Sequence, residues 1–178
     1  MRRRHILLAS LPLAATTLTR PAMSQTATPQ PPVMQVRTLD DALRWLDALQ
    51  RSPQVTMRGQ WPIGTVLNHL AQSIEMSLDG YPAPKSALFQ ATAGAAAFAF
   101  FQWRGRMSHG LAEPIPGAPA LPMTADIQPG ADRLRAAITR FQSHTGPLMP
   151  HFAYGKLDKA QYAAAHAMHV GNHGEEVG

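Results

Sequence analysis

The residues with the clearest capacity for chemistry are histidines near the end of the chain. The sequence holds eight histidines and no cysteine, and three of the eight, His166, His169 and His173, fall within eight residues. On a helix, where successive side chains turn by about 100°, these three share one narrow face with Tyr162 and Glu176. His169 and His173 are four positions apart, which lets two imidazoles reach one metal ion.

A pair of histidines needs at least one further ligand to make a metal site. His69 is the best candidate, because it flanks the apolar stripe of a second helix that would pack in the same bundle. Three neutral imidazoles with an open position suit Zn²⁺, Ni²⁺ or Fe²⁺ and are poor ligands for Mg²⁺ or Ca²⁺. The alternative is that one or two of these histidines are surface or core residues without a metal.

Glu176 lies one turn beyond His173 on the same face and is the expected catalytic residue. As a carboxylate it can be a fourth ligand, a general base or a group that orients a ligand imidazole, and the alternative is a frayed, solvated residue. His166 is an alternative ligand, although we expect it beside the ligands or facing solvent. His109 and His151 fall in segments expected to be loops, and we expect each to be an ordinary loop histidine, with loops that border the site as the alternative.

The elements that must position these residues are predicted from apolar spacing and from end signals. Thr38 can cap a first helix, Pro62 can begin a second, and Asp158 with Gln161 has the spacing of a capping box for the last. The expected helices cover about residues 39–50, 62–79, 87–104, 131–143, and 158 onward through Glu176. No strand and no repeat is expected, so the predicted fold class is an all-α bundle.

A long irregular stretch is expected between the third and fourth helices, at residues 106–130. Five prolines interrupt it, at positions 114, 116, 119, 122 and 129. Loops of this length inside a small domain often serve as lids or binding loops, and the alternative is a passive strap.

The first 24 residues are typical of an export signal. Three arginines at positions 2–4 precede an apolar run of about ten residues, and small residues at 22 and 24 favour cleavage after Ser24. The pair Arg3-Arg4 resembles a twin-arginine signal, with a general secretory signal as the alternative. The expected organisation is a signal peptide at 1–24, a flexible linker at 25–36 and one domain at 37–178. The expected location is the periplasm.

The basic character of the chain belongs mainly to that first segment. The formal net charge is +5, but from residue 25 onward 12 basic residues stand against 11 acidic ones, a net charge of +1. Nucleic acid is therefore not an expected partner, and a stable membrane anchor after cleavage is not expected either. The lack of cysteine excludes disulfides, thiolate metal sites and a cysteine nucleophile.

Two segments carry a resemblance to a known family. Residues 61–75 (WPIGTVLNHLAQSIE) resemble the helix that carries the first metal ligand in DinB-like proteins. Residues 154–157 (YGKL) and 169–178 (HVGNHGEEVG) resemble the last helix of that superfamily and its lead-in. The resemblance runs over residues 37–178 and points to a branch of unknown function.

The resemblance implies a four-helix bundle with an up-down-down-up course, here with an extra helix and the long Pro-rich loop. It implies that His69, His169 and His173 hold a metal, because DinB-like proteins carry a three-histidine site. Members of known activity include thiol-dependent transferases and isomerases, in which the metal activates the sulfur of a small thiol. The sequence departs from the branch where Glu176 replaces a usual glutamine and Asn172 a frequent histidine.

The expected function is an exported metal-dependent hydrolase or thiol-dependent transferase that uses a divalent transition metal, Zn, Ni or Fe. The alternatives are a non-catalytic exported bundle that binds a metal or another ligand, and a vacant bundle. The expected partners are a small-molecule substrate of unknown identity and, in a homodimer, a second copy of the chain.

Overall fold

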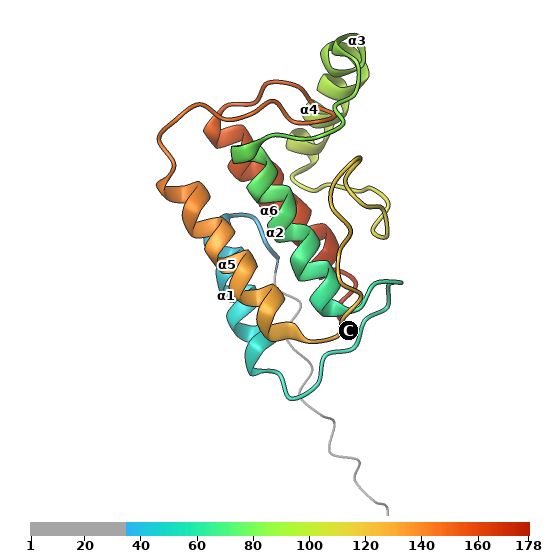
Figure 1. Cartoon of the computed structure of the whole chain (residues 1–178), viewed down its shortest axis with the longest axis vertical. Helices are drawn as coiled ribbons and strands as arrows, with labels where there is room; N and C mark the ends of the chain where they lie inside the picture. The colour runs from blue at the N-terminus through green and yellow to red at the C-terminus, as the bar shows by residue number, and fades with distance from the viewer. Residues whose placement is uncertain (1–34) are drawn as a thin grey trace, which may run out of the picture.

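The computed structural model describes residues 35–178 and shows an all-α fold, as predicted. Five helical segments make up the described part, and no strand is present in it beyond two isolated β-bridges. Four long helices lie side by side, and a fifth projects from one end (Figure 1). The segments are α1 (Leu39–Arg51), α2 (Ile63–Asp79), the continuous run α3 (Ala87–Phe89), η1 (Gln90–Gly94) and α4 (Ala95–Arg104), then α5 (Ile127–Ser143) and α6 (Lys159–Gly174).

The predicted caps of the first and last helices are confirmed. The Thr38 side chain accepts a hydrogen bond from the Asp41 backbone N–H, and the Asp41 carboxylate accepts one from the Thr38 backbone in return. Asp158 and Gln161 exchange the same pair of bonds at the start of α6. Each box satisfies two backbone donors that the helix leaves without partners, so both starting points are set locally by sequence.

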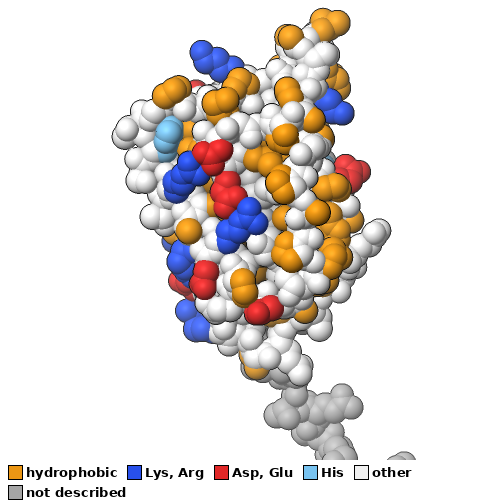
Figure 2. Space-filling view, viewed as in Figure 1, with side chains coloured by type: hydrophobic (Ala, Val, Ile, Leu, Met, Phe, Trp, Pro, Cys, Tyr) orange, Lys and Arg blue, Asp and Glu red, His pale blue; other side chains and the backbone are white. Residues whose placement is uncertain are grey.

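Helix α2 is the central element, and all of it except Glu75 and Asp79 is buried. It packs against α5 and α6, and the loop between α4 and α5 covers another side, where the Thr65 backbone N–H donates to the carbonyl of Thr124. Across the outer surface of α2 and α5, paired acidic and basic side chains lie together (Figure 2), including a bidentate contact of Arg133 with Glu75. This buried position of α2 places His69 inside the molecule.

The third helical segment has the predicted extent but not the predicted regularity. It contains a π-helical turn at Gln90–Gly94, where a Cβ on Gly94 would come within 2.0 Å of the Ala153 carbonyl oxygen. Glycine therefore lets the loop at residues 151–155 approach the helix backbone. The projecting segment leaves large apolar side chains in solvent, and Figure 2 shows hydrophobic side chains at its tip. Trp103 is 82% exposed and Leu88 76% exposed.

Two predicted boundaries are corrected by the structure. Helix α5 begins at Ile127 rather than near residue 131, because Asp126 caps it and Pro129 sits in its first turn, where a backbone N–H has no intrahelical partner anyway. Val36, assigned to the flexible linker, is buried in the core. The predicted signal peptide and the linker up to residue 34 lie outside the described residues.

The C-terminal end departs from the predicted helix. Helix α6 ends at Gly174, so Glu176 lies in the turn that follows it rather than on the helical face. The Arg58 backbone N–H donates to the Glu176 carbonyl at 2.8 Å, and Met57 pairs with Val177 in a β-bridge. These contacts hold the end of the chain against the α1–α2 connection. Within residues 35–178, no helix is both long enough and apolar enough to cross a membrane.

Candidate metal centre

The structure brings together the three histidines that the sequence predicted as ligands. His69 comes from the middle of α2, and His169 and His173 come from the last two turns of α6. One ring nitrogen of each lies within 4.8 Å of those of the other two. The ring centroids are 5.1 Å apart for His69 and His169, 5.2 Å for His69 and His173, and 5.0 Å for His169 and His173. Three imidazoles that converge in this way could hold one metal ion.

The hydrogen bonding of these rings provides a test of whether a metal fits. Among residues 35–178, no donor or acceptor bonds to the buried atoms Nδ1 of His69, Nε2 of His169, and Nδ1 and Nε2 of His173. Buried polar atoms are nearly always hydrogen-bonded, and one left without a partner costs about 1–3 kcal/mol. Three unpaired imidazoles that face one another are therefore suited to a divalent transition metal, whose bonds would satisfy them.

The electrostatic state of the cluster also suits a metal. Burial, with a smaller contribution from the neighbouring imidazoles, lowers the pKa of His69 to about 4 and that of His173 to about 3. Burial likewise depresses the pKa of His169. The imidazoles are therefore neutral near pH 7, which is the form that binds metal ions.

The carboxylate of Glu176 lies beside one ring nitrogen of His173. Its Oε2 lies 3.5 Å from Nδ1 of His173, slightly too far for a hydrogen bond, and burial raises the pKa of its carboxyl group. The side chain is only 14% exposed, so the predicted alternative of a frayed, solvated residue is wrong. Because Glu176 faces Nδ1, the other ring nitrogen, Nε2, is the one left to bind a metal.

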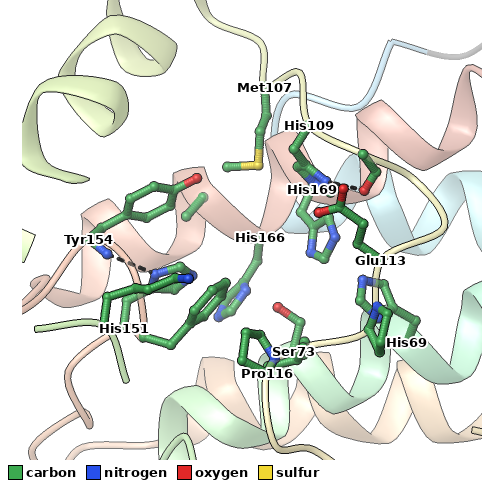
Figure 3. A pocket seen from close by; sticks show the side chains of 16 residues that line it. His69, Ser73, Met107, His109, Glu113, Pro116, His151, Tyr154, His166 and His169 are labelled. Atoms are coloured by element: carbon green, nitrogen blue, oxygen red, sulfur yellow. Dashed lines mark hydrogen bonds between the residues drawn. The ribbon is translucent and has the colours of Figure 1, made fainter. Parts of the chain in front are cut away.

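A cavity of about 240 Å³ opens beside the cluster (Figure 3). His69 and His169 stand at one end of it, and His151 and Tyr154 stand at the other. Its walls come from α2, α6, the loop between α4 and α5 and the loop at residues 151–155. The apolar part of the wall includes Met107, Ile115, Pro116 and Phe152. The cavity has the size of a small organic molecule and a mixed polar and apolar lining.

His166 lies beside the cluster rather than in it. It is buried, which agrees with the first of the two expected positions, beside the ligands, and not with the second, facing solvent; its Nε2 lies 3.2 Å from the Ser77 hydroxyl. Since the Ser77 hydroxyl already donates to the Ile74 carbonyl, Nε2 of His166 must carry the proton and donate. Burial lowers the pKa of His166 to about 3, so this ring stays neutral.

His151 is also part of the cavity wall. Its ring stacks on Tyr154 at 4.2 Å, and its Nδ1 accepts hydrogen bonds from the backbone N–H groups of Ala153 and Tyr154. Burial lowers its pKa to about 3. His151 is therefore a buried neutral ring with a defined tautomer, rather than the ordinary loop histidine that we expected.

His109 lies next to the cluster, although the sequence favoured an ordinary loop histidine at this position. It belongs to the long loop, yet its ring centroid lies 4.9 Å from that of His169 and 5.8 Å from that of His173. Neither helical periodicity nor a motif marks its position, because a loop side chain has no fixed direction relative to a distant helix. The only available signal was the unusual length and proline content of the loop itself.

Comparison with known proteins places the chain in a family. Searches of the curated proteins and of the solved structures found no match. Residues 16–178 match the model of a family described as protein of unknown function (DUF1569). The match covers all five helical segments and all three clustered histidines. The chain therefore belongs to the DUF1569 family of proteins of unknown function.

Proposed function

We propose that this protein is a metal-dependent enzyme, a hydrolase or a thiol-dependent transferase, that holds a divalent transition metal on His69, His169 and His173. The observation that carries the proposal is the convergence of three imidazoles, two buried and one half-buried, at the end of a cavity; each has a buried nitrogen that lacks a hydrogen-bond partner among the described residues. When bound, zinc, nickel or iron(II) supplies Lewis-acid chemistry to an oxygen or sulfur of the substrate. Between the two reactions we favour hydrolysis, because a small thiol is a poor cosubstrate for an exported protein.

The chain's own residues supply binding and orientation. The apolar wall at Met107, Ile115 and Phe152 would hold the carbon skeleton of a small substrate and exclude water. The Ser73 side chain projects into the cavity between its two ends (Figure 3) and offers a hydroxyl for orienting a polar group. We assign Glu176 a positioning role on His173, because its carboxylate faces Nδ1 of that ring and does not line the cavity.

We also propose that the fold is a DinB-like four-helix bundle with an up-down-down-up course. Two features support this: four long helices pack together, and the three clustered histidines come from α2 and α6, the helices that the resemblance identified. An experimental structure of the protein with metal bound would test the helix course and the ligand set together.

Export is proposed on the N-terminal sequence alone, and residues 1–24 lie outside the described part of the chain. We expect expression in a bacterium with both export routes to place a product in the periplasm that begins at Gln25. Replacing Arg3 and Arg4 by lysine should retain the chain in the cytoplasm if the route is the twin-arginine one. Cytoplasmic accumulation of uncleaved wild-type chain would contradict export.

The metal site is tested by the metal content of protein purified without a histidine tag. We expect about one equivalent of a transition metal in the wild type and less than a tenth of that in the His169→Ala and His173→Ala double variant. His144→Ala is a matched control, because His144 is a half-buried histidine outside the cluster, and it should retain full content. Equal metal in the wild type and the double variant would overturn the proposal.

Catalysis is tested separately from binding. Metal-loaded wild type is incubated with panels of esters, amides and phosphoesters, and with small thiols plus an electrophile. Turnover that disappears in the His169→Ala variant supports the enzyme. A protein that binds metal and converts none of these compounds supports the alternative of a non-catalytic metal-binding bundle.

A further inference from the structure

The loop between α4 and α5 lies over one side of the histidine cluster. Within this loop, His109 is the residue whose ring lies nearest to the rings of the cluster. His109 is exposed, whereas His69 and His173 are buried. Figure 3 shows its ring next to that of His169, at the edge of the cavity. Its neighbour Met107 is buried in the core, so this part of the loop is held close to α6.

The spacing of the rings is close to what one ion requires. With metal–nitrogen bonds of about 2.0–2.1 Å, two imidazoles on a tetrahedral ion have centroids about 5 Å apart. The three clustered rings meet this at 5.0–5.2 Å, and His109 meets it toward His169 at 4.9 Å. Its 5.8 Å to His173 is longer, and His109 is not among the residues whose ring nitrogens lie within 4.8 Å of one another, so an inward movement of the loop is needed to complete the set.

The tautomer of His109 leaves the correct atom free. Its Nδ1 lies 2.8 Å from the Gly110 carbonyl oxygen, which can only accept a hydrogen bond. Nδ1 must therefore carry the proton, and the lone pair of Nε2 is left to bind a metal. Histidines that bind metals commonly donate a hydrogen bond from the other ring nitrogen to a backbone carbonyl, which fixes the orientation of the ring.

We propose that His109 is a fourth metal ligand, carried by the loop, so that metal binding fastens this loop over the cavity. The inference rests on the proposed three-histidine site and adds a ligand that a substrate would displace from the solvent side. The loop has separate attachment points on α2, through Thr65 to Pro122 and Gln72 to Pro119, so its later part is held independently of His109.

The first test measures Zn²⁺ affinity by competition with a chromogenic chelator and records the visible spectrum of the Co²⁺ form. Loss of a partner outside the ligand set already weakens affinity by about 10–100-fold, so His109→Ala should weaken it by more than about tenfold. It should also lower the intensity of the Co²⁺ bands that mark four-coordination. The matched control His144→Ala, which changes a half-buried histidine outside the cluster, should behave as the wild type.

The second test follows the loop directly by limited proteolysis with trypsin. Arg104 and Arg106 are exposed and precede His109, so cleavage after them reports whether the loop is open. We expect Zn²⁺ to slow this cleavage in the wild type and in His144→Ala but not in His109→Ala.

The outcomes separate the two proposals. Wild-type affinity, spectrum and protection in His109→Ala would overturn the fourth ligand while leaving the three-histidine site intact. Glu113 is the other group at this edge of the cavity, and a loss that appears in Glu113→Gln instead of His109→Ala would also overturn it. Failure of the wild type to bind Zn²⁺, or unchanged binding in His69→Ala, would overturn the proposed metal site itself.

Discussion

The burial of His173 is difficult to explain without a ligand. Both ring nitrogens are inaccessible, and neither has a hydrogen-bond partner among residues 35–178. A leucine or phenylalanine of similar volume would fill the same space without leaving unpaired polar atoms. His166, on the same helix and also buried, shows the contrast, because its Nε2 has the Ser77 hydroxyl as a hydrogen-bond partner. The unpaired rings are therefore the ones that converge, and the paired ring lies outside the cluster.

Glu176 should influence metal binding through His173. Replacing it by alanine removes the carboxylate that lies 3.5 Å from Nδ1 and is placed to orient the ring when a metal binds, so Zn²⁺ affinity should fall by about 10–100-fold. Glu176→Gln keeps an acceptor oxygen and should retain most of the affinity. Competition with a chromogenic chelator checks both variants. A merely structural role would be indicated if both variants lost stability equally and bound Zn²⁺ as tightly as the wild type.

The two buried histidines outside the cluster, His151 and His166, should make the metal-free protein sensitive to acid. Burial lowers both pKa values to about 3, whereas an unfolded histidine titrates near 6.5. Below that pH the unfolded state binds more protons, so the free energy of unfolding decreases as pH falls, by about 2 kcal/mol per histidine between pH 6.5 and 5. Urea unfolding in the presence of a chelator at several pH values measures this slope.

The matched variants for that measurement are His166→Gln and His144→Gln. Glutamine at 166 can still donate to Ser77 but does not titrate, so the loss of stability on acidification should be smaller. His144→Gln is the control variant, because His144 lies outside both the cavity and the cluster. An unchanged slope in His166→Gln would contradict the prediction.

At the scale of the elements, the contact between α2 and α5 depends on glycine. A Cβ on Gly130 would lie 2.8 Å from Cβ of Leu67 and 2.9 Å from the carbonyl oxygen of Gly64. A Cβ on Gly64 would lie 2.2 Å from the backbone oxygen of Asp126. The two helices therefore approach backbone to backbone at their crossing, and this approach fixes where His69 lies relative to the rest of the core.

Gly130→Ala should consequently destabilise the protein. The added methyl group would meet the backbone carbonyl of Gly64 and the Cβ of Leu67, which cannot move away without moving the backbone. Overpacking of this kind costs about 1–3 kcal/mol. Gly174→Ala is the control, because its nearest neighbour, Trp45, stands at an ordinary 3.6 Å and alanine favours the helix. Urea unfolding should therefore show a loss for the first variant and none for the second. Equal stabilities would contradict the tight crossing.

The local signals in the sequence explain which elements were predictable. The capping residues Thr38 and Asp158 act on their own backbone neighbours, so both helix starts followed from sequence. The π-helical turn before Ala95 lies against the distant Ala153 carbonyl, a contact that sequence periodicity does not report. The placement of Glu176 failed for the same reason, because the α1–α2 connection holds the end of the chain after Gly174.

The candidate site divides in the same way. His169 and His173 are four positions apart on one helix, so the helix alone brings them together. His69 followed from its place beside an apolar stripe, because a buried helix must face its neighbours. His109 depends on the path of an irregular loop, and neither its proximity to His169 nor its tautomer has a counterpart in the sequence pattern.

At the scale of the whole molecule, the metal site would join segments that are far apart in sequence. His69 lies in the central helix α2, His169 and His173 lie near the end of α6, and Glu176 belongs to the turn held by the α1–α2 connection. Unfolding separates these segments, so the unfolded chain cannot offer the same set of ligands. A metal that binds the folded state alone must therefore stabilise the entire fold.

Zn²⁺ should accordingly raise the melting temperature. A free concentration of 100 times the dissociation constant adds about 2.7 kcal/mol to the free energy of unfolding, which corresponds to about 2–4 °C for each kcal/mol in a chain of this size. The shift should be reversed by a chelator, absent with Mg²⁺, absent in His169→Ala and retained in the control His144→Ala. Differential scanning calorimetry measures it. An equal shift in His169→Ala would mean that Zn²⁺ binds elsewhere, because removing one of three converging imidazoles must weaken a site that links α2 to α6.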